Sequence, residues 1–291
     1  YRSAKNKINK NRVHVLPKFT RDTTDRNRTS PFAFTGNKFE FRMLGSSNSI
    51  ACANIMLNAT VAESLKQFAD ALETTESFES ALHDLIQKTI KEHRRIIFNG
   101  NGYDDAWIKE ATEVRGLLNL RTTPDAMPHL LDKKNVDMLT AHKVFTKAEL
   151  ESRYEIMLEN YCKTVNIEAL TMVDMAKKEI LPAVEGYAKE LSDAVIAKTT
   201  AVPGLACKYD KSVITKLSTL ADEIDTAAAA LESAANKYKT VEDVTEASCM
   251  IRDVILQKMA ELRVVCDEAE TVTAEKYWPF PTYEKLLFGV R

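Results

Sequence analysis

The architecture of the chain is set by residues 146–204, which read TKAELESRYEIMLENYCKTVNIEALTMVDMAKKEILPAVEGYAKELSDAVIAKTTAVPG. Apolar positions return about every 3.7 residues in this stretch, close to the ~3.6 residues of one helical turn. Thr146-Lys147-Ala148-Glu149 fits a capping box at its start, and Pro203-Gly204 is expected to end it. Pro182 should kink the helix, because it lacks an N–H group and crowds the carbonyl four residues back. The apolar stripe consists of Tyr154, Leu158, Tyr161, Val165, Ala169, Met172, Ala176, Ile180, Val184, Tyr187, Leu191 and Val195.

Two further apolar stripes come after it. The first of them consists of Val213, Leu217, Leu220, Ile224, Ala227, Leu231, Ala234 and Tyr238. The second begins near Thr240 and consists of Val244, Ala247, Ile251, Ile255, Met259, Leu262, Cys266 and Ala269. Three long stripes joined by short links can bury one another only as an antiparallel bundle. The sequence therefore predicts a mainly α fold with a helical domain over residues 66–275.

A short α+β piece is expected before the bundle, over residues 1–65. Residues 31–44 read PFAFTGNKFEFRML, and their alternating aromatic residues flank Gly36-Asn37, which predicts strand, turn and strand. From Ser49 onward the spacing changes to that of a helix. The apolar positions of this helix suit a buried element; they are Ile50, Ala53, Ile55, Leu57, Val61 and Leu65.

Two shorter helices are predicted between this piece and the bundle. Residues 76–98 form an amphipathic stretch that stops at Asn99-Gly100-Asn101-Gly102, and residues 103–117 form a short helix around Trp107. At the other end of the chain, residues 276–291 form a separate tail that includes YWPFPTY. Such a segment either docks in extended form on another surface, on the catalytic domain or a neighbouring subunit, or covers the end of its own bundle.

Composition and charge narrow the functional classes. Apolar residues make up 45% and charged residues 28% of the 291 residues, as in folded soluble proteins, and no apolar window approaches a membrane span. The five cysteines form no C-x-x-C pair, so we expect small packing residues in a reducing compartment. Residues 1–28 carry nine Lys or Arg side chains against two Asp, which gives this arm +7 and the rest of the chain −9. The arm is either a solvated basic surface, a nucleic-acid contact or a loop that meets phosphates.

The candidate chemistry lies on residues 38–42. If they form a strand, its period of two places Lys38, Glu40 and Arg42 on one face and Phe39 and Phe41 on the other, where we expect the core. The charged face is either a routine solvent-exposed ladder or a site for a metal–phosphate complex. Common catalytic motifs such as a P-loop or H-E-x-x-H do not occur in the sequence.

Several stretches, in the same order from about Val13 onward, resemble type III glutamine synthetases. They are DRNRTSPFAFTGNKFEFRMLGSS, NGNGYDDAW, RGLLNLRTTPDAMP, KVFTKAELESRYEIMLENY and YWPFPTYEKLLF. The resemblance implies that Glu40 ligates a divalent metal and that Arg28 and Arg42 bind the transferring phosphate and substrate glutamate. Asn27 matches the Asn of the family's Asn-Arg element, and Lys38 falls where a nucleotide-contacting basic residue is common. The family's Arg five residues after Arg28 is replaced by Ala33.

The resemblance also implies the reaction and its setting. The expected activity is ATP-dependent joining of L-glutamate and ammonia with Mg²⁺ or Mn²⁺, in a cytoplasmic homo-oligomer built as a double hexameric ring, a dodecamer. We expect neither nucleic acid nor a membrane as a partner. The chain starts at Tyr1, so it is expected to begin inside a larger protein or to have been trimmed; other family ligands should lie upstream, and this polypeptide alone should be inactive. The alternative is a non-enzymatic helical scaffold with a basic N-terminal arm.

Overall fold

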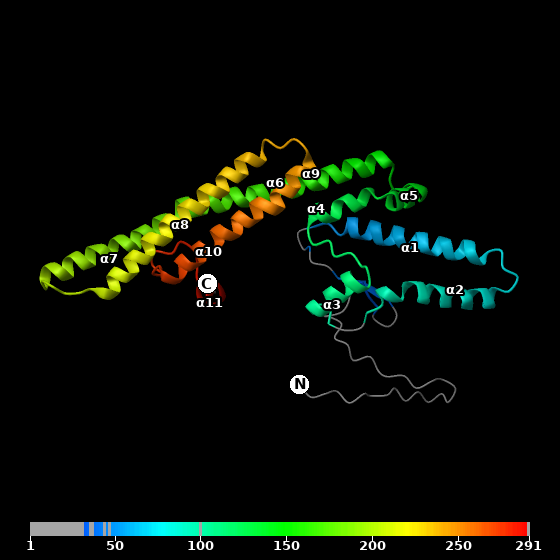
Figure 1. Cartoon of the computed structure of the whole chain (residues 1–291), viewed down its shortest axis with the longest axis horizontal. Coiled ribbons are helices and arrows are strands. Elements are labelled where there is room, and N and C mark those ends of the chain that lie inside the picture. Colours follow the sequence, from blue (N-terminus) through cyan, green and yellow to red (C-terminus); the bar gives the residue numbers. More distant parts are fainter. Residues whose placement is uncertain (1–31, 35–37, 43–44, 46–47, 99–100, 290–291) are drawn as a thin grey trace, which may run out of the picture. The chain divides into compact units, whose positions relative to one another are not determined.

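A computed structural model describes residues 32–34, 38–42, 45, 48–98 and 101–289. The chain forms two compact units, Tyr1–Leu120 and Arg121–Arg291. Helices dominate the described residues of both, and the strands found there lie at the start of the first unit. The predicted mainly α fold is confirmed (Figure 1).

The first unit begins with two short antiparallel strands, β1 (Phe32–Phe34) and β2 (Phe39–Phe41). In their register Phe32 pairs with Phe41, and Ala33 pairs with Glu40. The predicted pair of strands is therefore confirmed, and its register fixes which side chains share a face.

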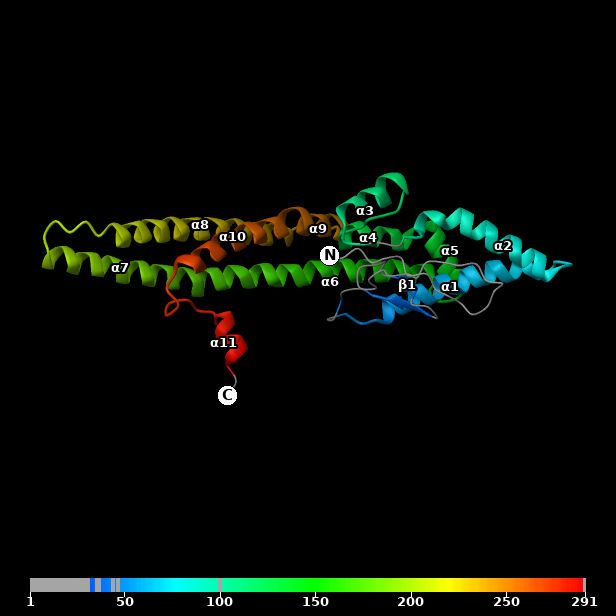
Figure 2. The same cartoon turned by 90° about the horizontal axis from the view of Figure 1, so that it is seen from below.

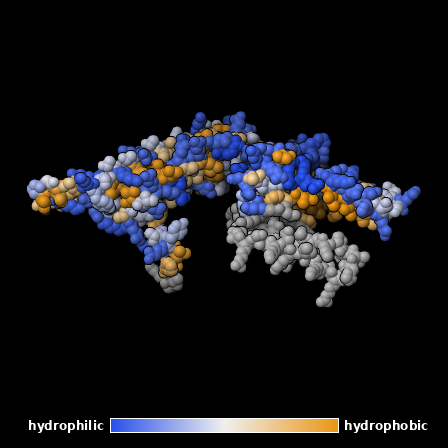
Figure 3. Space-filling view, turned by 60° about the horizontal axis from the view of Figure 1, so that its bottom comes forward, coloured by the Kyte–Doolittle hydropathy of each residue, from blue (hydrophilic) through white to orange (hydrophobic). Residues whose placement is uncertain are grey.

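Two antiparallel helices follow, α1 (Ala51–Leu72) and α2 (Phe78–His93), and they pack against each other. The prediction of a buried α1 is wrong: Ala59 is its one buried residue, and Val61 and Leu65 are 47% and 61% exposed. The reason is geometric: α1 packs against one neighbouring helix, and a single neighbour covers only one side of it. Apolar side chains accordingly reach the surface over α1 and α2, at the right of Figure 3.

An aromatic contact holds the last part of the first unit together. After the 3₁₀ turn η2 (Arg94–Ile96), the chain forms α3 (Asp105–Lys109), which continues into the π-helical turn η3 (Glu110–Val114). The ring of Trp107 stacks on Phe98 with centroids 3.7 Å apart. The Arg115 guanidinium lies 4.7 Å from the Trp107 ring and donates to two backbone carbonyls near the end of η2, at 2.9 and 3.2 Å. Arg115 thus connects the two predicted short helices.

The second unit is a bundle of long helices with a short connector at its start. Its elements are α4 (Thr123–Ala126), η4 (Met127–Leu131), α5 (Lys133–Ala141), α6 (Lys147–Met175), η5 (Ala176–Ile180), α7 (Leu181–Ala201), α8 (Lys208–Tyr238), α9 (Val244–Met250), η6 (Ile251–Ile255), α10 (Leu256–Val272) and α11 (Tyr283–Phe288).

Three helical rods make the bundle. The first is α6–η5–α7, the second is α8 and the third is α9–η6–α10 (Figures 1 and 2). Thr146 forms the predicted capping box with Glu149, and Gly204, at φ +84°, lies in the turn between α7 and α8. The core and the half-buried residues packed against it include most residues of the three predicted stripes. Cys162 and Cys266 are buried in it, as expected for small packing residues, whereas Cys52 on α1 is exposed and does not fit that expectation.

Two of the three rods contain a π-helical turn, and both turns occur where the spacing of the stripe demands one. The stripe advances by four residues three times in succession from Met172 to Val184, and η5 lies inside this interval. It does the same from Ala247 to Met259, around η6. Three turns of an ordinary α-helix take about 10.8 residues rather than twelve, so the surplus residue goes into the wider turn. Helix continues through Pro182, the second residue of α7, and the kink expected there stays a prediction.

Ionic contacts attach the connector to the bundle. The guanidinium of Arg252, on η6, donates to Asp125 at 2.6 Å and to Asp253 at 2.6 Å. The hydroxyl of Thr122 accepts the N–H of Asp125, which caps the first turn of α4. The segment after residue 120 is therefore fixed to the third rod.

The aromatic tail folds back onto its own bundle. Trp278 and Phe280 pack against the bundle core, and the Tyr277 hydroxyl donates to Glu190 on α7 at 2.6 Å. Lys276 donates to the same carboxylate. Of the two expectations for residues 277–280, covering the bundle is the one observed. The following α11 leaves its apolar side chains largely exposed.

We predict that Ile224→Ala destabilises the bundle far more than Ile196→Ala. Ile224 on α8 is fully buried, whereas Ile196 on α7 is 63% exposed. The buried change should cost about 2–5 kcal/mol and the exposed one less than about 0.5 kcal/mol. Urea unfolding followed by far-UV circular dichroism measures both, and equal losses would contradict the assigned core.

A second prediction concerns the pH dependence of the tail contact. Hydrogen bonds from Lys276 and Tyr277 hold the pKa of Glu190 below its usual 4.5. A carboxyl whose pKa is lowered by folding contributes stability above its unfolded pKa and loses it as pH falls through the folded value. The difference in thermal midpoint between wild type and Glu190→Gln should therefore be present at neutral pH, shrink as the pH falls below 4.5, and vanish once the pH passes below the lowered pKa of the folded state. Glu185→Gln, on the same helix, is the control, and a difference that persists in acid would refute the assignment.

Candidate functional site

Strand β2 brings three of the predicted site residues together. Glu40 is its central residue, and Lys38 and Arg42 lie two positions before and after it. Alternation along the strand places the three side chains on one face, where the register sets Ala33 opposite Glu40. The predicted juxtaposition is therefore present in the structure.

The Glu40 carboxylate lies between the two cations. Arg42 Nε donates to Glu40 Oε2 at 3.1 Å, and a second nitrogen of the same guanidinium donates to that oxygen. Lys38 Nζ lies 3.7 Å from Glu40 Oε1. The side chains of Glu40 and Arg42 are 29% and 32% exposed, so the pair is half-buried yet reachable from solvent. The result is a carboxylate held in a fixed direction with positive charge on both sides.

The opposite face of β2 differs from the prediction. Phe39 and Phe41 are 59% and 44% exposed, where a core was expected. Two strands form a single layer, and the other described residues leave this side of the layer accessible. Sequence reasoning also missed that Phe32 stacks on Phe39, with ring centroids 5.0 Å apart. Aligning the two strands about Gly36-Asn37 would have found this diagonal pair.

The remaining predicted residues, Asn27 and Arg28, lie outside the described residues, as does the basic arm over residues 1–28. Their roles stay predictions. The geometry of the site is therefore that of β1 and β2.

The Glu40 carboxylate could supply one oxygen ligand to a hard divalent cation. Mg²⁺ takes about six oxygen ligands, commonly one or two carboxylates with water and phosphate oxygens. The described residues contain no group of three or more His, Cys, Asp or Glu side chains placed to hold a metal. Glu40 therefore fits as one ligand, and a cation bound here would need further oxygens from elsewhere. The neighbouring Lys38 and Arg42 suit the phosphate oxygens that accompany such an ion.

The helices of the second unit are long, but a membrane-spanning helix must also be apolar along its length. Among the described helices, none combines the length and apolar composition that crossing a membrane requires. Charged residues lie between the apolar positions along every long helix of the bundle.

Comparison with known proteins bears on this arrangement. A family model described as the glutamine synthetase C-terminal domain matches residues 81–199. A glutamine synthetase of Butyrivibrio fibrisolvens is 39% identical over 287 residues, which cover 94% of this chain and 39% of that protein. The chain is similar to glutamine synthetases over 94% of its length. A type-3 glutamine synthetase of Dictyostelium discoideum is 33% identical, and a glutamine synthetase of Bacteroides fragilis is 31% identical, each over 94% of this chain and 38% of its own length.

The glutamine synthetase match covers only a part of each relative. The chain spans about two-fifths of the length of the curated relatives it matches. The match to the C-terminal domain runs from α2 to near the end of α7, and so includes residues of both compact units. The similarity to glutamine synthetases thus includes residues of the helical region. The reaction that the chain takes part in is a matter of proposal.

Proposed function

We propose that this chain is the C-terminal part of a type III glutamine synthetase, an ATP-dependent glutamate–ammonia ligase. In this reaction the γ-phosphoryl group of ATP passes to the side-chain carboxylate of L-glutamate, giving ADP and γ-glutamyl phosphate. Ammonia then attacks the carbonyl carbon, phosphate leaves, and loss of a proton gives glutamine. The names of the relatives and the ordered sequence stretches support the proposal.

The observation that carries the proposal is the Glu40 carboxylate set between Lys38 and Arg42 on one strand face. Phosphoryl transfer needs charge neutralisation and positioning more than covalent help from the protein. Glu40 would be one ligand of Mg²⁺ or Mn²⁺, which when bound neutralises phosphate charge. Arg42 would bind phosphate or the glutamate carboxylate, and its contact with Glu40 orients both groups.

The residues outside the described part complete the proposed site. Arg28 would stabilise the transferring phosphoryl oxygens, and Asn27 would contact the nucleotide together with Lys38, which belongs to the described residues. Because the described residues supply Glu40 but no cluster of metal ligands, the site requires other segments. We therefore propose that this polypeptide alone is inactive and that its parent works as a cytoplasmic double-ringed dodecamer, with the bundle in an assembly or regulatory role.

Glu40→Ala in the full-length enzyme should reduce glutamine formation by about 100-fold or more while oligomeric assembly survives. The reason is that the substitution removes a metal ligand and leaves Lys38 and Arg42 without their counter-charge. Phosphate release and glutamine formation, measured at saturating ATP, glutamate and ammonia, give the activity; size-exclusion chromatography gives the assembly.

The matched control is Glu113→Ala, which removes an exposed carboxylate that lies 4.0 Å from Lys109, four residues earlier in the same helical segment. Its activity should equal that of wild type. Wild-type turnover in Glu40→Ala would remove Glu40 from the metal site. A full-length protein that makes no glutamine in any form would favour the alternative of a non-enzymatic helical scaffold.

Arg28→Lys should lower turnover by about tenfold or more. The substitution keeps the positive charge but loses the planar fork that holds two phosphate oxygens at once. Steady-state kinetics on the full-length enzyme measure the effect, with Arg121→Lys as a control of the same chemistry outside the proposed site. An unchanged rate would count against a role of Arg28 in the transfer.

A further inference from the structure

The tail crosses the bundle as a strap made of residues 276–280, and one carboxylate on α7 holds its start. Lys276 and the Tyr277 hydroxyl donate to the same oxygen of Glu190, the hydroxyl at 2.6 Å. The Tyr277 ring lies against the Tyr187 ring, with centroids 5.7 Å apart. The side chains of Lys276 and Glu190 are 60% and 45% exposed, so water competes for these polar contacts.

The strap approaches α7 closely at Gly186. A Cβ placed on Gly186 would lie 3.2 Å from two ring carbons of Tyr277, which is nearer than ordinary van der Waals contact. A glycine inside a helix costs stability relative to alanine, so the helix itself gives no reason for a glycine here. The missing side chain leaves the room that the Tyr277 ring needs.

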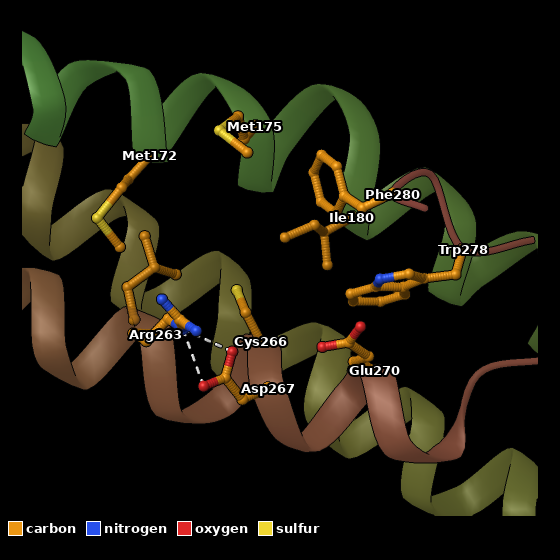
Figure 4. A pocket seen from close by; sticks show the side chains of 10 residues that line it. Met172, Met175, Ile180, Arg263, Cys266, Asp267, Glu270, Trp278 and Phe280 are labelled. Carbon is orange, nitrogen blue, oxygen red and sulfur yellow. Dashed lines mark hydrogen bonds and ion pairs between the residues drawn. The ribbon is translucent and has the colours of Figure 1, made fainter. Parts of the chain in front are cut away.

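The two rings that follow close a cavity without filling it. Trp278 and Phe280 lie over a space of about 310 Å³, whose other walls include Ile180 and Cys266 (Figure 4). Side chains beside an unfilled space lose dispersion contacts on that side. The indole Nε1 of Trp278 is also buried without an acceptor among the residues that the structure describes, and it gains one from water when the ring lifts. Both features lower the free energy needed to open the strap.

The strap receives little support from the helix that follows it. The large apolar side chains of α11 stay exposed. Lys285 of this helix pairs with Glu275 at 2.8 Å, but the two side chains are 62% and 60% exposed, and such a pair contributes little. The contacts of residues 276–280 therefore decide whether the tail stays on the bundle.

We propose that residues 276–280 form a strap that lifts from the bundle while the three rods stay folded, and that lifting opens the cavity and uncovers Cys266. The contacts with Glu190 and the space left by Gly186 hold the strap closed. Access to the cavity is then governed by the strap, without unfolding of the rods. The inference concerns the second unit alone and does not depend on the reaction proposed for β2.

Cys266 reports on the strap, and Cys162 is its matched control. Both side chains are buried in the same core. Burial raises the pKa of the Cys266 thiol to about 11 and also raises the pKa of the Cys162 thiol, so neither forms the reactive thiolate readily while the bundle is closed. Cys266 lines the cavity under the strap, whereas Cys162 is not among the lining residues.

The first test labels the full-length wild-type protein with N-ethylmaleimide and follows both cysteines by peptide mass spectrometry. When labelling is slow relative to closing, its rate follows the population of the open form. Cys266 should react at least about tenfold faster than Cys162, because lifting a short segment costs less free energy than unfolding the rods. Low concentrations of urea should accelerate Cys162 more steeply than Cys266, since the urea dependence scales with the surface exposed.

The second test is Gly186→Ala, which adds the methyl group that crowds Tyr277. Labelling of Cys266 should become about fivefold faster. Labelling of Cys162 should change by about twofold or less, because alanine strengthens α7 by roughly as much as it weakens the strap. In a Tyr277→Ala background the same substitution should no longer accelerate Cys266, since no ring remains to be crowded.

The third test removes the charge that holds the start of the strap. Glu190→Gln should accelerate the labelling of Cys266 by about two- to fivefold at neutral pH, the range expected for an exposed ion pair. Glu185→Gln removes a carboxylate from the same helix and should leave the rate unchanged.

Two results would overturn the proposal. Labelling of Cys266 that is no faster than that of Cys162, with the same urea dependence, would mean that the strap moves only when the rods unfold. Faster labelling of Cys266 that neither Gly186→Ala nor Glu190→Gln alters would mean that the thiol becomes accessible by another route. The first comparison uses the wild type alone, so it decides the matter even where a variant fails to fold.

Discussion

The bundle depends on keeping one side of each rod facing its neighbours over its whole length. On α8 the apolar positions advance by four and three residues in strict alternation, so an ordinary helix keeps them aligned. The other two rods each contain three successive steps of four residues, and there an ordinary helix would turn the stripe away from the core. The turns η5 and η6 absorb the extra residue, and Ile180, Ile251 and Ile255 remain buried.

That adjustment has a consequence for the surface of the rods. A wider turn changes the spacing of side chains around it, and a cavity lined by Met172, Met175 and Ile180 lies beside η5. Large aromatic residues from outside the helices then cover the gap, which explains why Trp278 and Phe280 pack against the core although they come after its last long helix. The hydrogen bonds from Lys276 and Tyr277 to Glu190 fix this segment on α7. The tail is therefore part of the packing of the bundle.

Much of the fold could be predicted from the sequence because it depends on local spacing. The three stripes, the capping box at Thr146 and the alternation around Glu40 are properties of neighbouring residues, and each appears in the structure. The π-helical turns were also present in the spacing, but the averaged period concealed them. The exposure of α1 and of Phe39 could not be predicted from the sequence. Burial depends on which surface covers a side chain, and the spacing of apolar residues carries no information on that surface.

The exposed aromatic face of β2 affects how the proposed site can be positioned. A two-stranded layer with Phe39 and Phe41 accessible buries too little apolar area to fix its own position. In the proposed site, the orientation of Glu40 would then depend on the surface that covers those rings. A site shared with other segments of a glutamine synthetase would provide both the missing cover and the missing ligands. In the proposed site, packing of the aromatic face would fix the position of β2, and the position of β2 would set that of Glu40 on the opposite face. The packing and the chemistry would therefore depend on the same contact.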